Sequence, residues 1–390
     1  MTRARLAVWL PLVFVPLAAW SKDTAVIALI LAAAAMLAAG TRPSLCWPMI
    51  GLAVWAAVAM LWAPEPAWTN WLQSWIVISA AAILVGGIET RTFRPPTTPV
   101  VYAVVALFGI LLVERVTGGG VIGLVRTTDT TDRLFNVLSA GLAFLCCLTF
   151  PAAALIARTY KLPAAAIFAA AVFALAVSYH MDAAPAALAV GAIAFAAVYL
   201  GGRRVLFAGA VVAALVAMLW GVAAELAVAR GAADWLNAHV DVNWGLRVQI
   251  WARVATLIGE HPFIGLGFEA GRMVGRPDVT GAPVPVPFMH PHNGMLQVWL
   301  ELGVVGVALL LAWGALAVRR LAVLAANKSA LATAAATLAT TSVFWLVSFG
   351  LWAGWWLAAL GLIAAALVLA LRSDARAVVP HPGLEHQNTP

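Results

Sequence analysis

Apolar stretches long enough to cross a bilayer recur along the whole 390-residue chain. A transmembrane helix needs about 20 consecutive, mostly apolar residues, and a backbone in lipid must satisfy its own hydrogen bonds. Twelve such stretches lie near 6–20, 24–40, 45–62, 71–88, 99–113, 136–157, 163–179, 183–201, 205–228, 296–318, 330–348 and 351–371. The sequence therefore predicts an all-α, polytopic integral membrane protein with about 12 transmembrane helices.

The composition agrees with this fold class and excludes several functions. Hydrophobic residues make up 64% of the chain and charged residues 10%, whereas charged residues are about 25% of an ordinary soluble domain. The net charge of +7 could indicate nucleic-acid binding, but the basic residues stand in short pairs between apolar stretches. That pattern is typical of membrane orientation, so we expect a lipid bilayer and no nucleic acid as partner.

The basic residues also orient the chain. With the N-terminus in the cytoplasm, the cytoplasmic side carries 14 of the 23 Lys and Arg residues, and five of the other nine fall in one long loop. Cytoplasmic loops are enriched in Lys and Arg. We therefore expect both termini in the cytoplasm and the long loop on the opposite side of the membrane.

This orientation divides the chain into four parts. Helices 1–9 occupy residues 1–228, a large periplasmic loop of short helices occupies 229–294, helices 10–12 occupy 295–371, and a disordered cytoplasmic tail occupies 372–390. Polar chemistry is concentrated in the long loop. We therefore expect the functional site there.

Within the loop, residues 243–260 have the spacing of an amphipathic helix. One apolar stripe contains Ile250, Trp251, Val254, Leu257 and Ile258, which recur at intervals of three and four. Arg247 lies on this apolar stripe. Its guanidinium must either reach lipid head groups or meet a buried anion.

Two further segments of the loop have candidate ligand-binding residues. After His261-Pro262, Gly265 and Gly267 indicate a tight turn, which either exposes free amides to a ligand or is simply a re-entrant turn. A stiff, Pro-rich segment then leads to the sequence Met-His-Pro-His-Asn at residues 289–293.

The two histidines of that sequence have three interpretations. A shared metal would need further ligands, because His290 and His292 face opposite ways if the segment is extended. A structural role is the second, with Asn293 as N-cap of the next helix. A catalytic base is the third. The three cysteines, Cys46, Cys146 and Cys147, lie in apolar stretches without zinc spacing, and we expect no metal site and no cofactor.

Arg247 in RVQIW, the segment HPFIGLGFE and the segment HPHNGMLQVWLELG together resemble the O-antigen ligase family. That family includes O-antigen polymerases and pilin O-oligosaccharyltransferases. The sequence resemblance is concentrated in residues 246–306. The predicted topology agrees with the family over the whole chain.

The resemblance implies an inverting, metal-independent glycosyltransferase of the bacterial inner membrane. Its donor would be a glycan on undecaprenyl diphosphate, and its acceptor a hydroxyl of the lipid A-core or another saccharide. His292 would be the catalytic base and Arg247 would hold the diphosphate. We expect Asn293, His290, Gly265 and Gly267 to contact substrate.

The chain departs from the family at one place. Family members often carry an arginine after a late helix, in a Ser-x-Ser-Arg-like segment that grips the diphosphate. The corresponding residues 178–182 contain no arginine. His180 is one candidate substitute. Arg126 and Arg133, from an earlier loop at about 114–135, are the others.

Other functions remain open at this point. A polymerase of the same superfamily differs from a ligase only in its acceptor. A transporter or flippase of lipid-linked sugar would also have many helices, but transporters place ionisable sites at mid-membrane. Here the predicted spans are almost free of ionisable residues. A membrane scaffold would tolerate changes at His292.

Overall fold

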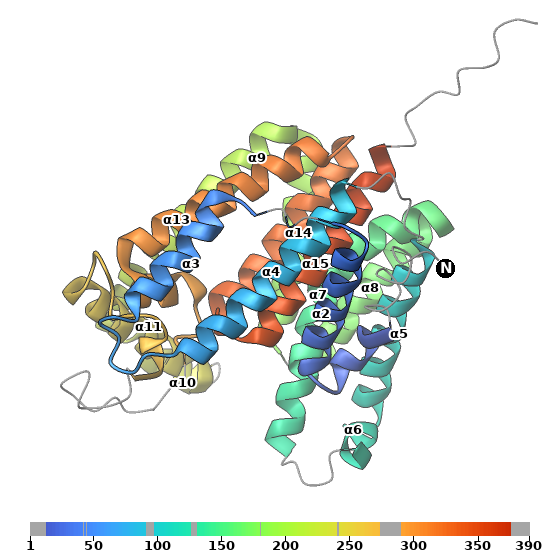
Figure 1. Ribbon diagram of the computed structural model, residues 1–390. Helices are drawn as coiled ribbons and strands as arrows, with labels where there is room; N and C mark the ends of the chain where they lie inside the picture. The colour runs from blue at the N-terminus through green and yellow to red at the C-terminus, as the bar shows by residue number, and fades with distance from the viewer. Residues whose placement is uncertain are drawn as a thin grey trace, which may run out of the picture.

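A computed structural model describes residues 13–41, 43, 45–90, 97–125, 131–179, 181–239, 242–273 and 290–375. Within these ranges every regular element is a helix (Figure 1). The elements are η1 (Pro16–Ala19), α2 (Asp23–Ala38), α3 (Trp47–Ala59), α4 (Trp68–Thr90), α5 (Thr98–Val116), α6 (Gly120–Val125), α7 (Thr131–Tyr160), α8 (Leu162–Ser178), α9 (Ala183–Ala229), α10 (Ala232–His239), α11 (Val242–Glu260), η2 (Ala270–Met273), α13 (Gly294–Leu324), α14 (Lys328–Val347) and α15 (Gly354–Ala375).

Seven of these helices are long and apolar enough to cross a bilayer: α4, α5, α7, α9, α13, α14 and α15. Three shorter apolar helices, α2, α3 and α8, accompany them. The prediction of an all-helical, polytopic membrane protein is confirmed. The described residues do not reproduce the expected twelve separate spans.

One difference lies in α9, where the two expected spans meet at a kink instead of at a basic loop. The element Ala183–Ala229 consists of two helices that meet at this kink, and Arg203 and Arg204 lie at the start of the second. Gly202 adopts φ +68° at the kink. Because glycine has no Cβ, it can take this conformation and turn the chain while helical geometry resumes at the next residue, so no loop is needed.

The second difference lies at the first expected span, 6–20. Residues 1–12 are outside the described ranges, and Pro16–Ala19 form a short 3-10 helix. Pro16 lacks a backbone N–H and disfavours a continuous α-helix at this position. The tail expected from residue 372 also begins later, because α15 continues to Ala375; the rest of that tail lies outside the described residues.

The centre of the bundle is formed by α15 against α4 and α2, with α14 packed along α9 (Figure 1). Trp356, Phe144 and Phe344 are buried there. A Cβ on Gly361 of α15 would come within 2.7 Å of the Ala81 Cβ in α4. Helices without a hydrophobic driving force in lipid pack through such small residues.

At one end of the bundle, the long loop meets turns that were predicted to share its side of the membrane. A Cβ on Gly267 would lie 2.5 Å from the Ala63 Cα, and a Cβ on Gly350 would lie 2.9 Å from the His290 ring. These close contacts place the turns after α3 and α14 against the loop. The gathering of these segments at one end agrees with the predicted orientation.

Helix ends predicted to be cytoplasmic also meet one another. Arg320 of α13 forms an ion pair with Glu89 near the end of α4. Arg372 of α15 donates a hydrogen bond to the carbonyl of Ile88. Which of the two sides faces the periplasm stays a prediction.

Candidate functional site

The site begins where the long loop enters α13. Asn293 is the N-cap of this helix, and its Oδ1 accepts a hydrogen bond of 2.9 Å from the Leu296 N–H. The predicted N-cap is thus confirmed. The Asn293 side chain is fully buried, and its Nδ2 has no hydrogen-bond partner among the described residues. A buried amide donor of this kind suits a ligand oxygen.

His292 is held in one tautomer by a carbonyl from another part of the chain. Its Nδ1 lies 2.8 Å from the carbonyl oxygen of Ser348, which follows α14. A carbonyl oxygen can only accept, so Nδ1 carries the proton and Nε2 bears the lone pair of the neutral ring. Burial lowers the pKa of His292, as does the charge of Arg247, whereas the Ser348 hydrogen bond raises it. The ring is therefore a neutral base at neutral pH.

His290 lies beside His292, and the expectation that the two face opposite ways is wrong. Their ring centroids are 4.3 Å apart, and the His292 N–H donates to His290 Nδ1 at 3.2 Å. The reason is that His292 has φ +53°, so the segment is not an extended strand with alternating sides. Since Nδ1 of His290 accepts, its Nε2 is the protonated nitrogen of the neutral ring.

Three positively charged residues lower the pKa of one or both rings. The pKa of His290 is lowered to about 3, first by burial and then by its neighbours His292, Arg272, Arg247 and Lys22. The arginines and the lysine come from α11, from η2 and from the residue before α2. A group of cations converging on two neutral imidazoles from separate segments suits a polyanionic ligand.

Helix α11 supplies both a cation and an anchor for the histidine segment. It spans Val242–Glu260, which confirms the predicted helix 243–260. The Arg247 guanidinium lies over the Trp244 ring at 5.0 Å from its centroid. One turn further on, Trp251 Nε1 donates to the Pro291 carbonyl at 2.8 Å. The apolar stripe thus packs inward while fixing the residue between the two histidines.

The glycine turn that follows α11 uses its amides internally. The Gly265 N–H donates to the His261 carbonyl at 3.2 Å, and the Gly267 N–H donates to the Glu301 carbonyl at 2.9 Å. The expectation that these amides are free for a ligand is therefore wrong. They close a turn and attach it to α13.

A break in α13 explains where the turn attaches. Gly303 has φ +63°, and a Cβ there would lie 2.2 Å from the Phe263 carbonyl oxygen. Carbonyls just before the break need partners from elsewhere. Leu300 accepts from the Leu266 N–H at 2.8 Å, and Leu302 accepts from Trp55 Nε1 at 2.8 Å. The glycine turn therefore donates hydrogen bonds to carbonyls of α13 that the break leaves without helical partners.

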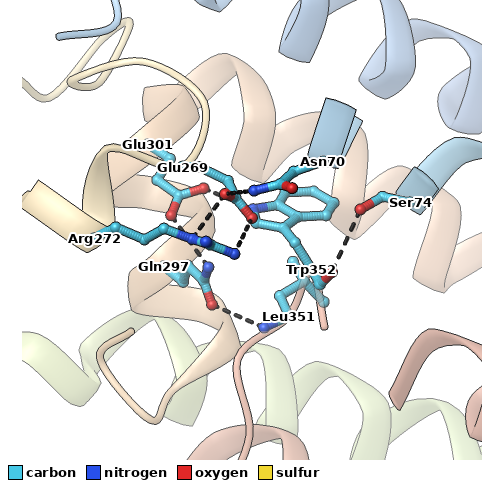
Figure 2. A network of polar contacts seen from close by, with 8 residues as sticks. All are labelled: Asn70, Ser74, Glu269, Arg272, Gln297, Glu301, Leu351 and Trp352. Atoms are coloured by element: carbon cyan, nitrogen blue, oxygen red, sulfur yellow. Dashed lines mark hydrogen bonds and ion pairs between the residues drawn. The ribbon is translucent and has the colours of Figure 1, made fainter. Parts of the chain in front are cut away.

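Behind the histidines lies a buried polar network that the sequence did not reveal (Figure 2). Glu301 of α13 is 1% exposed, and its carboxylate accepts from Trp352 Nε1 at 2.6 Å and from Gln297 Nε2 at 3.1 Å. Gln297 Oε1 in turn accepts from the Leu351 N–H at 2.8 Å. The one sequence signal for this network was Glu301 inside an apolar stretch, because a buried carboxyl group needs hydrogen-bond partners.

The same network holds Arg272 in place. Arg272 forms an ion pair with Glu269, with Nε 2.8 Å from Oε2 and Nη2 3.2 Å from Oε1. Asn70 of α4 donates to the same carboxylate. Burial raises the pKa of Glu269, while Asn70 and the Arg272 charge lower it. Arg272 is therefore held against the bundle by its ion pair with Glu269. Its side chain remains half exposed, and its charge acts on His290.

The proposed substitutes for the family arginine fall largely outside the described structure. Arg126 and His180 are not among the described residues, and Arg133 lies in α7 with its side chain not described. However, Arg115 at the end of α5 donates from Nε to the Ser178 carbonyl at 2.6 Å. A guanidinium therefore does reach this segment, from a helix that the motif comparison did not consider.

That segment is connected to the histidine site. Asp182 accepts a hydrogen bond of 3.0 Å from Trp244 Nε1, and Trp244 is the ring under Arg247. Among the described residues, no group of three or more His, Cys, Asp or Glu side chains is placed to hold a metal ion.

Comparison with known proteins matches the part of the chain that carries these residues. Residues 164–311, which contain Arg247, the glycine turn and both histidines, match the family model described as O-antigen ligase. The resemblance to the O-antigen ligase family is thus confirmed. A protein of Rickettsia conorii named as a polysaccharide ligase is 30% identical over 117 residues. A second, from Rickettsia bellii, is 29% identical over 120 residues, and a third, from Rickettsia prowazekii, is 39% identical over 71.

These relatives align only in part. The first two alignments cover 28% and 29% of this chain and 28% of each relative, and the third covers 17% of both chains. This chain therefore spans less than a third of the length of each of these relatives.

Proposed function

We propose that this chain transfers a glycan from a polyprenyl-diphosphate donor to a saccharide hydroxyl at the membrane surface, as an O-antigen ligase does. The observation that carries the proposal is the arrangement of His292. Its Nδ1 is occupied by the Ser348 carbonyl, its Nε2 bears a lone pair, and Arg247 is close enough to lower its pKa. A neutral base beside a fixed cation is what transfer between a hydroxyl and a diphosphate ester requires.

In the proposed reaction, His292 activates the acceptor. Nε2 takes the proton of the acceptor hydroxyl as the oxygen attacks the anomeric carbon of the donor sugar. A new C–O bond forms, the bond to the diphosphate oxygen breaks, and attack from the opposite face inverts the anomeric centre. We propose that Asn293 Nδ2, which is buried without a hydrogen-bond partner among the described residues, donates to a sugar oxygen near the base.

The departing polyprenyl diphosphate carries the negative charge. Arg247 and Arg272 are proposed to hold it, because guanidinium groups meet phosphate oxygens through two parallel hydrogen bonds. Lys22 adds a third positive charge beside His290. These residues neutralise the leaving group by themselves, and we propose that no metal ion is needed.

The finer identity of the substrates is part of the proposal. We propose undecaprenyl diphosphate as the lipid carrier, the lipid A-core as acceptor, and a location in the bacterial inner membrane with both termini cytoplasmic. The family match supports this choice. Polymerisation onto another lipid-linked glycan is the second candidate, because the same base and cations would serve it.

A flippase is less well supported than a transferase. Glu301 is the buried carboxyl group nearest the site in α13, and Trp352 and Gln297 bind both its oxygens. A carboxylate engaged in this way serves structure more readily than ion passage. The structural role of Glu301 and the neutral ring of His292 together favour catalysis over transport.

The test compares variants in a deletion strain at matched membrane abundance. His292→Ala should abolish polymer-capped lipopolysaccharide while lipid-linked donor accumulates, with transfer lower by about 10²- to 10⁴-fold. Arg247→Lys keeps the charge but loses the paired hydrogen bonds, so transfer should fall well beyond a conservative change.

Three outcomes would redirect the proposal. Full transfer by His292→Ala at wild-type abundance would show that His292 is not the base. Short, single-unit polymer in the deletion strain would indicate a polymerase, and donor confined to the cytoplasmic face would indicate a flippase.

A further inference from the structure

The turn between α14 and α15 touches the histidine segment at two points. The Ser348 carbonyl accepts the Nδ1 proton of His292 at 2.8 Å. Two residues later, Gly350 packs so closely on the His290 ring that a Cβ would lie 2.9 Å away. The position of this turn therefore decides which nitrogen of His292 is protonated.

A turn without regular structure needs other bonds to fix it, and α13 supplies them (Figure 2). Gln297 lies one helical turn after Asn293 and accepts from the Leu351 N–H at 2.8 Å. Glu301 lies one turn further and accepts from Trp352 Nε1 at 2.6 Å. Gln297 and Glu301 bind each other at 3.1 Å, so their two contacts with the turn act together.

We propose that Gln297 and Glu301 are positioning residues that set the tautomer of His292 by holding the Ser348 carbonyl. The inference rests on the proposed function in one respect, namely that the unprotonated Nε2 is the working base. Neither side chain touches the reacting atoms in this proposal. They act through the backbone between Ser348 and Trp352.

The charges around His292 give the proposal a second readout. The charged and titratable neighbours are His290 in the same segment and Arg247 on α11, with Arg272 and Lys22 acting on His290. The Ser348 hydrogen bond is the contact that raises the pKa of His292. Losing that bond should therefore move the acidic limb of the rate profile to lower pH, because the base would take up its proton later as the pH falls.

The experiment measures the protonation of His292 directly, by ¹⁵N NMR of the histidine-labelled protein in lipid nanodiscs. Its resonance is assigned from the His292→Ala spectrum. In wild type we expect a protonated Nδ1. In Gln297→Met, which keeps the length but cannot hold the Leu351 N–H, we expect a growing share of protonated Nε2. Transfer should fall by about tenfold to 10²-fold, the cost of a misplaced catalytic group.

Two variants serve as controls. The exchange Gln297→Glu with Glu301→Gln retains all three hydrogen bonds in reversed order, so it should restore the wild-type tautomer. Thr337→Val removes a buried hydrogen bond of 2.8 Å inside α14, far along the helix from the turn, and should leave the His292 spectrum unchanged. Gln297→Asn, which shortens the side chain by one methylene, is a second test if Gln297→Met fails to accumulate.

A protonated Nδ1 and an unshifted acidic limb in a folded Gln297→Met or Gln297→Asn variant would overturn the proposal. The proposed function fails separately. If His292→Ala keeps full transfer while Gln297→Met changes the tautomer, then the positioning is real and His292 is not the base.

Discussion

The attachment of the glycine turn to α13 makes a quantitative prediction for Gly265→Ala. Gly265 has φ +69°, and a Cβ there would lie 2.5 Å from the Glu301 carbonyl carbon and 2.7 Å from the Leu302 nitrogen. Alanine at positive φ costs about 1–2 kcal/mol. The new methyl also meets backbone, which cannot move like a side chain, and over-packing adds about 1–3 kcal/mol.

Gly231 provides a matched control in the same loop. It has φ +74°, and a Cβ added there would find nothing among the described residues within 4 Å. Gly231→Ala should therefore show the conformational cost alone, about 1–2 kcal/mol. Gly265→Ala should lose roughly 2–5 kcal/mol, the sum of the two effects.

The assay is thermal unfolding of the purified variants in a mild detergent, followed by tryptophan fluorescence. Wild type should melt highest, Gly231→Ala somewhat lower, and Gly265→Ala lowest, with a loss of transfer in cells. Equal melting of the two variants would refute the view that the turn is pressed against α13. It would leave only the backbone conformation of Gly265 as its constraint.

Changes at three further residues test the histidine segment. Trp251→Phe keeps a ring but leaves the buried Pro291 carbonyl without its donor, so it should cost about 1–3 kcal/mol in the same unfolding assay; unchanged melting would contradict the anchor. Asn293→Asp keeps the oxygen that caps α13, whereas Asn293→Ala should lose about 1 kcal/mol. Transfer that falls in Asn293→Asp without any fall in stability would identify the amide donor as a substrate contact. The pKa of His290 is lowered to about 3, so the folded protein should lose stability as the pH falls below about 6.5, where the unfolded ring takes up a proton. The share of this loss due to His290 should approach about 2 kcal/mol at pH 5 and should be absent in His290→Gln, in which the contribution of His292 remains. A pH profile identical to that variant's would show that the ring is not buried as described.

The parts of this molecule that could be predicted from sequence are those set by local patterns. The apolar stripe of α11 and the cap at Asn293 depend on residues within a few positions of each other, and both were confirmed. The length of the apolar stretches indicated a polytopic membrane protein for the same reason. The two helices of α9 were expected, but the loop between them was not found, because the conformation of Gly202 joins them directly at a kink.

The parts that escaped prediction depend on contacts between distant segments. Nothing near His292 indicates that its partner is the carbonyl of Ser348, which lies 56 positions away. The amide of Gly267 looked available because its acceptor, the Glu301 carbonyl, is uncovered by the break at Gly303, which occurs in another element. Similarly, we expected the two histidines to face opposite ways because side chains alternate along an extended strand. The positive φ of His292, which the sequence does not reveal, brings them together.

The hydrogen bond between His292 and Ser348 has a consequence for biogenesis. Ribosomes synthesise the histidine segment before α14 and α15, so the nascent chain acquires His292 well before the Ser348 carbonyl that selects its tautomer. The proposed base can therefore be assembled only after the α14–α15 hairpin has entered the membrane and its connecting turn has docked on α13. A chain stalled before that hairpin would carry the motif yet remain catalytically silent, which would keep an unfinished protein from consuming lipid-linked donor.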